Sequence, residues 1–299
     1  MASTTRPPDP LIVAANSTRL HYATGELLGA DDFQDEQTYH RRQLARALLH
    51  LHGSGTIAGL RVFPQHRPGA RTEEDEVELE VLPGLALDHA GRLIEVPRQA
   101  CLRLRRWYTF IADRTPSSEE LDASDLRAAW RVDAAIPAGG AVVADVFLTF
   151  HECDTGYTPA FASGPFDALD ASQPSRVRDG YELSLILRTE RDADLRDAFD
   201  PWAGIVGATL EQRLQSAEGI SFGLWDRLSQ PVPENPVDVD ATAVLLARLR
   251  IPARQNPAAD RAPIPDWSAT AWPDENANIN NRVRHILLPP GAVRFLIAP

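Results

Sequence analysis

The sequence contains no lysine, so all 30 of its basic residues are arginines. Its 42 acidic residues outnumber them and give a formal net charge of −12 at pH 7. A chain with this balance repels phosphate groups, so we expect neither general nucleic-acid binding nor binding to anionic membrane surfaces. We attribute the missing lysine to GC-rich coding, because alanine and arginine are abundant, and not to a chemical mechanism.

Cysteines and long apolar runs are also scarce. The two cysteines, Cys101 and Cys153, are too few for a disulfide scaffold, and since both lie in apolar segments we expect buried free thiols. No stretch reaches the roughly 18 uninterrupted apolar residues of a membrane-spanning helix, so no membrane insertion is expected. The first ten residues lack the apolar run of a secretory signal. We therefore expect cytoplasmic synthesis without a signal peptide.

The sequence does contain enough apolar material for a large core. It has 299 residues, of which 43% are apolar, and this length fits one large domain or two. We expect a flexible N-terminus over residues 1–16 and a first module, residues 17–110, that combines a helix with an antiparallel β-meander. The second module, residues 111–299, is expected to be rich in β-strands, with a long loop at 155–176 and a helical insertion.

The clearest element is a prominent N-terminal helix at about residues 31–52. Acidic residues begin it and Gly53 follows it, and both features favour a helix with these ends. One stripe with a spacing of three and four residues runs along it: Phe33, Gln37, His40, Leu44, Ala47 or Leu48, and Leu51. We predict that Phe33, Leu44 and Leu51 pack on the meander at 77–96, because a sheet with one apolar face needs a cover.

Two polar residues, Gln37 and His40, interrupt the centre of this stripe. They point to a solvated edge of the stripe, or they set the register of a helix that pairs with a second copy of itself. Both interpretations stay open at the level of sequence. Arg41 and Arg46 are expected on the outer face of the helix.

Several segments carry the two-residue alternation of β-strands. Val77, Leu79 and Val81 alternate with glutamates, which predicts a half-buried strand, and residues 85–96 predict a hairpin with Asp88 as a turn-stabilising residue. Further strands are expected at 56–63, 141–150, 181–187 and 243–249, and shorter helices near 117–131 and 192–226. The expected fold class is therefore α+β, mainly antiparallel β with the one prominent helix.

No motif for catalysis or metal binding is supported by its spacing. His40, His50 and His52 lie too far apart or on different helix faces to share an ion. Residues 151–154 combine an imidazole, two carboxylates and a thiol, but neighbouring residues of a strand point to opposite faces. We therefore predict a protein that is not an enzyme, with no catalytic, cofactor-binding or metal-binding residues. A hydrolase that uses the acidic and histidine residues of 145–154 is the alternative.

Three stretches of the sequence contain residues that match the positions of one known sequence pattern. The first matches at Tyr22, Gly25, Leu28, Asp32, Phe33, Glu36, Gln37, Tyr39, Leu51, His52, Gly53, Gly59, Leu60 and Val62. The second matches at Pro83, Gly84, Ala86, Asp88, Gly91, Arg92 and Ile94, and the third runs from Ser175 to Leu183. Together they resemble a family of hypothetical structural proteins encoded with phage-tail-like (extracellular) contractile injection systems. The match is strong over the first third of the chain and thin over the rest.

The resemblance implies a non-catalytic structural component of such a particle, associated with the baseplate. Its expected partners are other particle subunits, namely baseplate, sheath, tube or fibre proteins, with self-association through the N-terminal helix as a further expectation. The alternative is an adaptor that binds a cargo or fibre protein. No cofactor is implied, and a particle of this kind leaves the cell by lysis.

Overall fold

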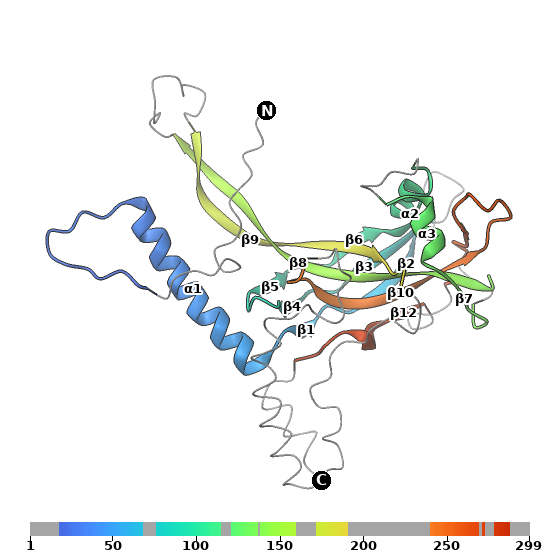
Figure 1. Cartoon of the computed structure of the whole chain (residues 1–299), viewed down its shortest axis with the longest axis horizontal. Helices are drawn as coiled ribbons and strands as arrows, with labels where there is room; N and C mark the ends of the chain where they lie inside the picture. Colours follow the sequence, from blue (N-terminus) through green and yellow to red (C-terminus); the bar gives the residue numbers. More distant parts are fainter. Residues whose placement is uncertain are drawn as a thin grey trace, which may run out of the picture.

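The computed structural model describes residues 18–67, 76–114, 121–136, 138–159, 172–190, 240–268, 271–272 and 278–287. Over these residues, helices accompany antiparallel sheets, which confirms the expected α+β class and its prominent N-terminal helix (Figure 1). The helices are α1 (Ala30–His52), α2 (Leu104–Ala112) and α3 (Ala123–Ala128), and a 3-10 turn, η2, spans Asn281–Val283. Within the described ranges, no helix has the length and apolarity that crossing a membrane requires.

The strands form three sheets. The largest has the order β11-β10-β8-β7, with β9 also paired to β8 and β12 to β10; the two smaller sheets have the orders β1-β4-β5 and β2-β3-β6. The strands are β1 (Gly55–Gly59), β2 (Val62–Arg67), β3 (Glu76–Val81), β4 (Gly84–Leu87), β5 (Leu93–Val96), β6 (Ala100–Arg103), β7 (Trp130–Val132), β8 (Gly140–Pro159), β9 (Ser172–Leu187), β10 (Val244–Arg254), β11 (Ile264–Pro265) and β12 (Ile279–Asn280). The single strand expected at 56–63 is therefore two strands in different sheets, joined at Leu60.

One apolar core joins both halves of the described chain. Leu60 and Leu79, from the module expected at 17–110, are fully buried in the same cluster as Leu148 and Leu246, from the module expected at 111–299. The central strands β8 and β10 pair in antiparallel register over most of the length of β10 and supply much of this core. The sheet body on which α1 is mounted is therefore a continuous packed unit.

Strand β3 differs from its expected half-buried form. Val77, Leu79 and Val81 are fully buried as expected, but Glu78 and Glu80 on the opposite face are buried as well. That face is covered by polar neighbours: Gln99 donates a hydrogen bond to Glu80, and the Arg103 Nε atom lies 3.8 Å from a Glu78 carboxylate oxygen. Alternation identified the strand correctly but could not show that the polar face has a cover.

The prediction of a long loop at 155–176 is wrong at both ends, where the chain forms paired strands. Strands β8 and β9 continue as a paired ribbon through this region, and their register runs through Tyr157–Pro174 to Pro159–Ser172 (Figure 1). Side chains of the ribbon, such as Tyr157 and Val177, are exposed. A ribbon with two solvated faces needs no apolar alternation, so its sequence resembles that of a loop.

The shorter helices also differ from expectation. Helix α3 lies within the range expected at 117–131 but ends at Ala128, because Trp130 begins β7 and pairs with Val142 of β8. Helix α2 was not expected; it buries Leu104, Tyr108 and Ile111, three positions on one helix face. The helix expected at 192–226 and the flexible N-terminus expected at 1–16 lie outside the described residues.

Neither cysteine is in a disulfide, as expected, but Cys101 is exposed and Cys153 is only partly buried. Cys101 lies on β6, where exposed and half-buried residues alternate, and it occupies an outward position. The expectation of two buried thiols was therefore wrong for Cys101, because the apolar letters around it belong to an edge of the sheet and not to its centre.

Candidate functional site

Helix α1 extends away from the sheet body, beside the projecting ribbon of β8 and β9 (Figure 1). The carboxylate of Asp32 accepts a hydrogen bond of 2.7 Å from the Gly29 backbone N–H and so caps the start of the helix. At the other end Gly53, with a φ of +75°, donates its N–H to the carbonyl of Leu49 and ends the helix. Of its 23 residues, only Ala45 is buried.

The stripe that the sequence predicted to cover the meander is exposed instead. Phe33 is 51% exposed, Leu44 59% and Leu51 76%. The prediction named the wrong face, because the helix contacts the body through Ala45, and successive residues of a helix point about 100° apart. The packed face carries a small residue that permits close approach, while the apolar stripe is left at the surface.

Ala45 rests on the turn between β4 and β5, which spans residues 88–92. At Gly91 of this turn, a Cβ atom would lie 2.1 Å from the Ala45 carbonyl oxygen, and its φ is +83°. Glycine is therefore required there for two reasons: it permits the backbone conformation, and it permits the close contact between the two backbones. This turn is the seat of α1.

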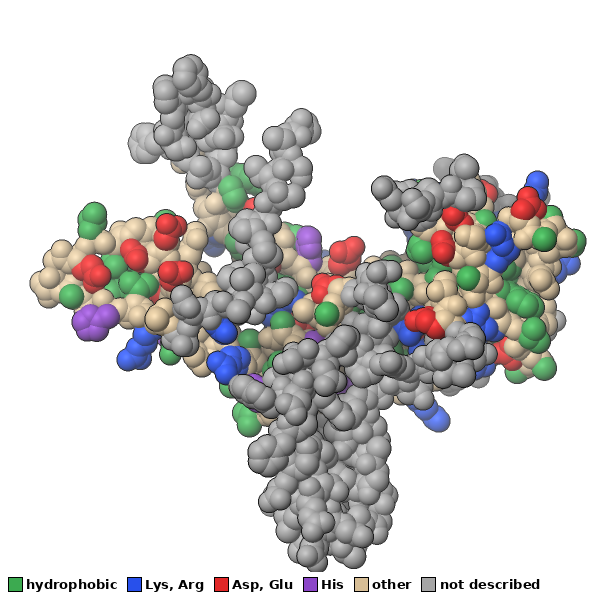
Figure 2. Space-filling model, in the orientation of Figure 1, with side chains coloured by type: hydrophobic (Ala, Val, Ile, Leu, Met, Phe, Trp, Pro, Cys, Tyr) green, Lys and Arg blue, Asp and Glu red, His purple; other side chains and the backbone are tan. Residues whose placement is uncertain are grey.

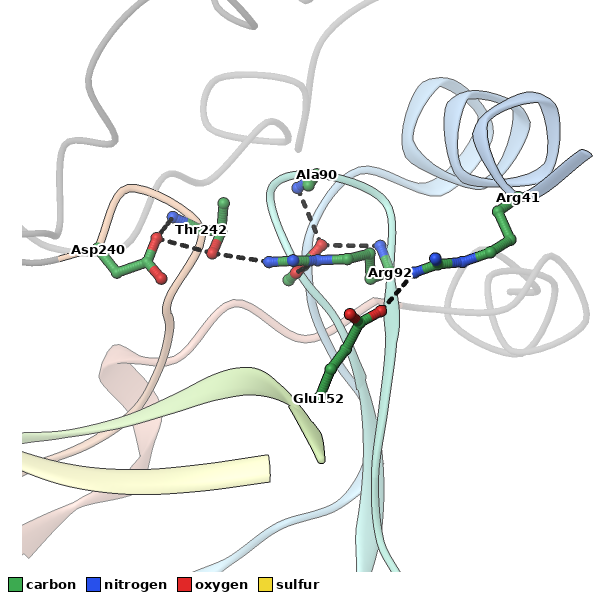
Figure 3. Close-up of polar contacts among 7 residues, drawn as sticks. Arg41, Ala90, Arg92, Glu152, Asp240 and Thr242 are labelled. Atoms are coloured by element: carbon green, nitrogen blue, oxygen red, sulfur yellow. Dashed lines mark hydrogen bonds and ion pairs between the residues drawn. The ribbon is translucent and has the colours of Figure 1, made fainter. Parts of the chain in front are cut away.

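The turn is itself held by a buried ion pair between Asp88 and Arg92, of which Figure 3 labels Arg92. The Asp88 carboxylate accepts hydrogen bonds from the backbone N–H groups of Ala90 (2.9 Å) and Arg92 (2.7 Å) and from Arg92 Nε (2.6 Å). This confirms Asp88 as a turn-stabilising residue. Burial raises the pKa of the Asp88 carboxyl, while the charge and hydrogen bonds of Arg92 oppose that shift.

Arg92 connects the turn to two other elements. Its Nη2 donates to the hydroxyl of Thr242 (3.0 Å), which in turn donates to Asp240 (2.8 Å), as Figure 3 shows. Its guanidinium also lies 4.6 Å from the centroid of the Phe150 ring on β8. The position of α1 is thus tied through Arg92 to the largest sheet.

A second contact joins α1 directly to the ribbon. Arg41 Nη2 donates to Glu152 of β8 at 2.9 Å, from the flank of the helix (Figure 3). Arg41 therefore does not lie on the outer face, as the sequence led us to expect, whereas Arg46 does. No spacing in the sequence pointed to this pair, because its members are 111 residues apart.

A third contact fixes the end of the helix. The Ser54 hydroxyl lies 2.6 Å from His89 Nδ1, and His285 Nδ1 donates to the Ser54 carbonyl at 2.7 Å. Burial, together with the nearby His285, lowers the pKa of His89 to about 4. A serine beside a histidine suggests a nucleophile and its base, but a histidine with so low a pKa is a weak base near neutral pH. We interpret this group as a brace between α1, the turn and the C-terminal segment.

The residues of the hydrolase alternative, 145–154, are placed in separate surroundings. Asp145 is fully buried and binds Arg248 (2.9 Å) and Arg188 (3.0 Å). Burial raises the pKa of its carboxyl against the hydrogen bond and charge of Arg248. His151 is exposed, and Glu152 binds Arg41. The structure therefore uses the two carboxylates as partners of arginines from distant elements.

One group in the described ranges has donor atoms close enough for a metal ion, and the sequence did not suggest it. Ligand atoms of Glu78, Glu80 and Cys101 lie within 4.8 Å of one another on neighbouring strands β3 and β6. Gln99 and Arg103 already occupy the two carboxylates, as described above. The existing polar contacts account for this cluster without an ion.

Part of the pattern that carries the family resemblance lies where α1 meets the body, and part lies at the outer end of the helix. Asp88, Gly91 and Arg92 make the seat, and the hydroxyl of Tyr22 donates to Glu36 of α1. At Gly59 a Cβ atom would lie 2.0 Å from the Pro83 carbonyl, so the approach of β1 to β4 also requires glycine. Asp88, Gly91 and Arg92 of the pattern are thus explained by the support that they give to α1. No protein-family model matches the chain, and no curated protein matches it significantly.

Proposed function

We propose that this protein is a non-catalytic structural subunit of a phage-tail-like contractile injection system, located at the baseplate, and that α1 is its docking element. One observation carries the docking role: an exposed apolar stripe on a helix that three separate contacts hold away from the body. The kind of particle follows from the family resemblance alone. Exposed large apolar side chains gathered on one surface are typical of protein–protein interfaces.

The contacts that restrain α1 favour a role in docking and not a role as a flexible linker. Backbone packing at Gly91, the Arg41–Glu152 pair and the Ser54–His89 brace restrain the helix at different points. A docking element that is already fixed in position loses less conformational entropy on binding, and so binds more tightly per contact. The fixed helix therefore suits a permanent assembly better than a transient encounter.

The partners that the family resemblance supports are the baseplate, sheath, tube or fibre proteins of the same particle. The net charge of −12 speaks against nucleic acid as the partner. In this proposal the chain is made in the cytoplasm, assembled there, and leaves the cell with the particle on lysis.

The test uses particles sedimented from cells that express the full-length chain. We expect the wild-type chain to co-sediment in fixed ratio to the baseplate proteins, and Leu44→Glu on the stripe to reduce its incorporation at least tenfold. Leu93→Glu is the matched control, because Leu93 is also an exposed leucine but lies on β5. Particles that lack the wild-type chain altogether contradict the baseplate role. Co-sedimentation in a variable ratio, with a bound cargo or fibre protein, favours the adaptor instead.

A further inference from the structure

The exposed stripe of α1 has the spacing of a coiled-coil seam. Six positions follow one another at intervals of four, three, four, three and four residues, and all six are exposed: Phe33, Gln37, His40, Leu44, Ala47 and Leu51. The intervals alternate between four and three residues, as the apolar positions of a coiled coil do, and their mean of 3.6 residues keeps the stripe on one face of the helix. In the rest of this subsection these six residues are called the seam.

The spacing of the seam positions, although not their residue types, is symmetric about Arg42. Phe33 and Leu51 lie nine residues on either side of Arg42, Gln37 and Ala47 lie five residues away, and His40 and Leu44 lie two residues away. Two antiparallel copies of α1 therefore align all six positions with one another. The largest seam residue, Phe33, then faces Leu51 of the second copy, and each polar seam residue faces an apolar one.

We propose that the seam is covered by α1 of a second copy of this chain, in antiparallel orientation. The proposal rests on the assignment of α1 as a docking element: the direct partner of the stripe is the second copy, and the pair is the unit that joins the other particle subunits. The dimer has a twofold axis near Arg42, which makes the interface self-complementary and closed.

Charge on α1 selects the antiparallel orientation. The first half of the helix carries four acidic residues, Asp31, Asp32, Asp35 and Glu36, and the second half carries three arginines, Arg41, Arg42 and Arg46. Acidic side chains gather over the projecting part of the helix (Figure 2). An antiparallel partner brings the acidic half of each copy near the basic half of the other, while a parallel partner brings like charges together. Because Arg41 binds Glu152 and Arg42 lies on the helix face opposite the seam, this attraction acts between the halves of the helices and not through ion pairs across the seam.

The two polar seam residues, Gln37 and His40, also favour the antiparallel orientation. In a parallel pair in register, Gln37 meets its own copy and His40 meets its own copy, so four polar groups are buried in two adjacent layers. In the antiparallel pair the same residues face Ala47 and Leu44 of the second copy, and their polar ends can reach the solvated edge of the seam. The two interpretations of Gln37 and His40 that the sequence left open are therefore compatible.

The first experiment measures the mass of the full-length chain by sedimentation velocity between about 1 and 100 µM. We expect a concentration-dependent species of twice the 32.9 kDa chain mass. Leu44→Glu and Leu51→Glu should each weaken the dimer at least tenfold, and Leu93→Glu should not. Circular dichroism melts confirm that the variants fold, which their exposed positions favour. A chain that stays monomeric over this range overturns the proposal.

The second experiment tests orientation by disulfide cross-linking in a background with both native cysteines replaced by serine. In the antiparallel pair, the two copies of residue 33 lie about 27 Å apart along the axis, from 18 residues at 1.5 Å each. Phe33→Cys alone and Leu51→Cys alone should thus not cross-link, while an equal mixture of the two should give the mixed dimer. Cross-linking of either variant with itself, with no mixed dimer formed in the mixture, shows a parallel pair and overturns the proposal.

The two proposals fail separately. A monomeric chain whose Leu44→Glu variant is still lost from particles contradicts the second copy and leaves the docking role intact. A dimer with the predicted cross-links that is absent from particles contradicts the particle role alone.

Discussion

Arg41 of α1 donates a hydrogen bond of 2.9 Å to Glu152 of β8, and so joins the exposed helix to the ribbon that projects beside it. The Arg41 side chain is 40% exposed and that of Glu152 is 12% exposed, so water screens this pair in part. Pairs of this kind contribute up to about 1 kcal/mol to the free energy of unfolding. The contact therefore orients α1 more than it stabilises the fold.

We accordingly expect Arg41→Ala to lower the free energy of unfolding by less than about 1 kcal/mol in urea titrations. Amide hydrogen exchange along α1 should nevertheless speed up, because the helix loses one of its three restraints. Arg46→Ala, on the exposed outer face of the same helix, is the control and should leave exchange unchanged. Equal exchange rates in the two variants contradict the orienting role.

Gly91→Ala should release α1 from its seat. The added methyl group meets the Ala45 carbonyl at 2.1 Å, so the helix or the turn must move, and the φ of +83° adds backbone strain. Gly139→Ala is a matched control, because Gly139 has a φ of +80° but open space around its Cβ position. Both variants carry the conformational cost of roughly 1 kcal/mol.

The difference between these two glycine variants in urea unfolding isolates the contact with α1. We expect Gly91→Ala to be less stable than Gly139→Ala by more than about 1 kcal/mol. Equal stability of the two variants shows that the helix does not rest firmly on this turn.

The buried pair Asp88–Arg92 should be far more sensitive than a similar pair at the surface. Arg92→Ala leaves the Asp88 carboxylate buried without its charged partner, which typically lowers stability by about 3–5 kcal/mol. Arg250 pairs with Asp133 at 2.9 Å, but its side chain is 55% exposed, so Arg250→Ala should lower stability by less than about 1 kcal/mol. Comparable losses for the two arginines in chemical denaturation contradict this account of the seat.

The sequence predicted those features that depend on local pattern. The acidic start of α1, the Gly53 stop and the turn at Asp88 were all recognisable, because each is determined by residues within a few positions of one another. The fold class followed from the alternation in β3 and the apolar runs in β8 and β10.

The features that were missed depend on contacts between distant residues. The apolar stripe of α1 predicted burial, since periodicity gives the angle between side chains and not the side that faces the body. A single close contact, Ala45 on Gly91, decides that question, and small residues give no periodic signal. The Arg41–Glu152 and Ser54–His89 pairs likewise bring together residues 111 and 35 positions apart. The ribbon of β8 and β9 was taken for a loop, because its two faces are solvated.

The pH dependence of stability should report on the brace between Ser54 and His89. Burial lowers the pKa of His89 to about 4 in the folded chain, against an ordinary value of 6.5 in the unfolded chain. Between these values the unfolded state binds a proton that the folded state does not, so stability falls as the pH falls from about 6.5 towards 4. Above pH 6.5 this contribution is fully present, and the loss at pH 4 amounts to at most about 3 kcal/mol.

His89→Asn should remove this part of the pH dependence, because asparagine does not titrate and its amide oxygen can still accept a hydrogen bond from Ser54. Asp88 and Asp145, whose pKa values are raised by burial, act in the opposite direction, so the difference between wild type and variant is the quantity to measure. Urea unfolding at pH 7.5 and pH 4.5 gives that difference. If stability depends on pH in the His89→Asn variant as it does in wild type, burial beside Ser54 does not keep His89 neutral in the folded chain.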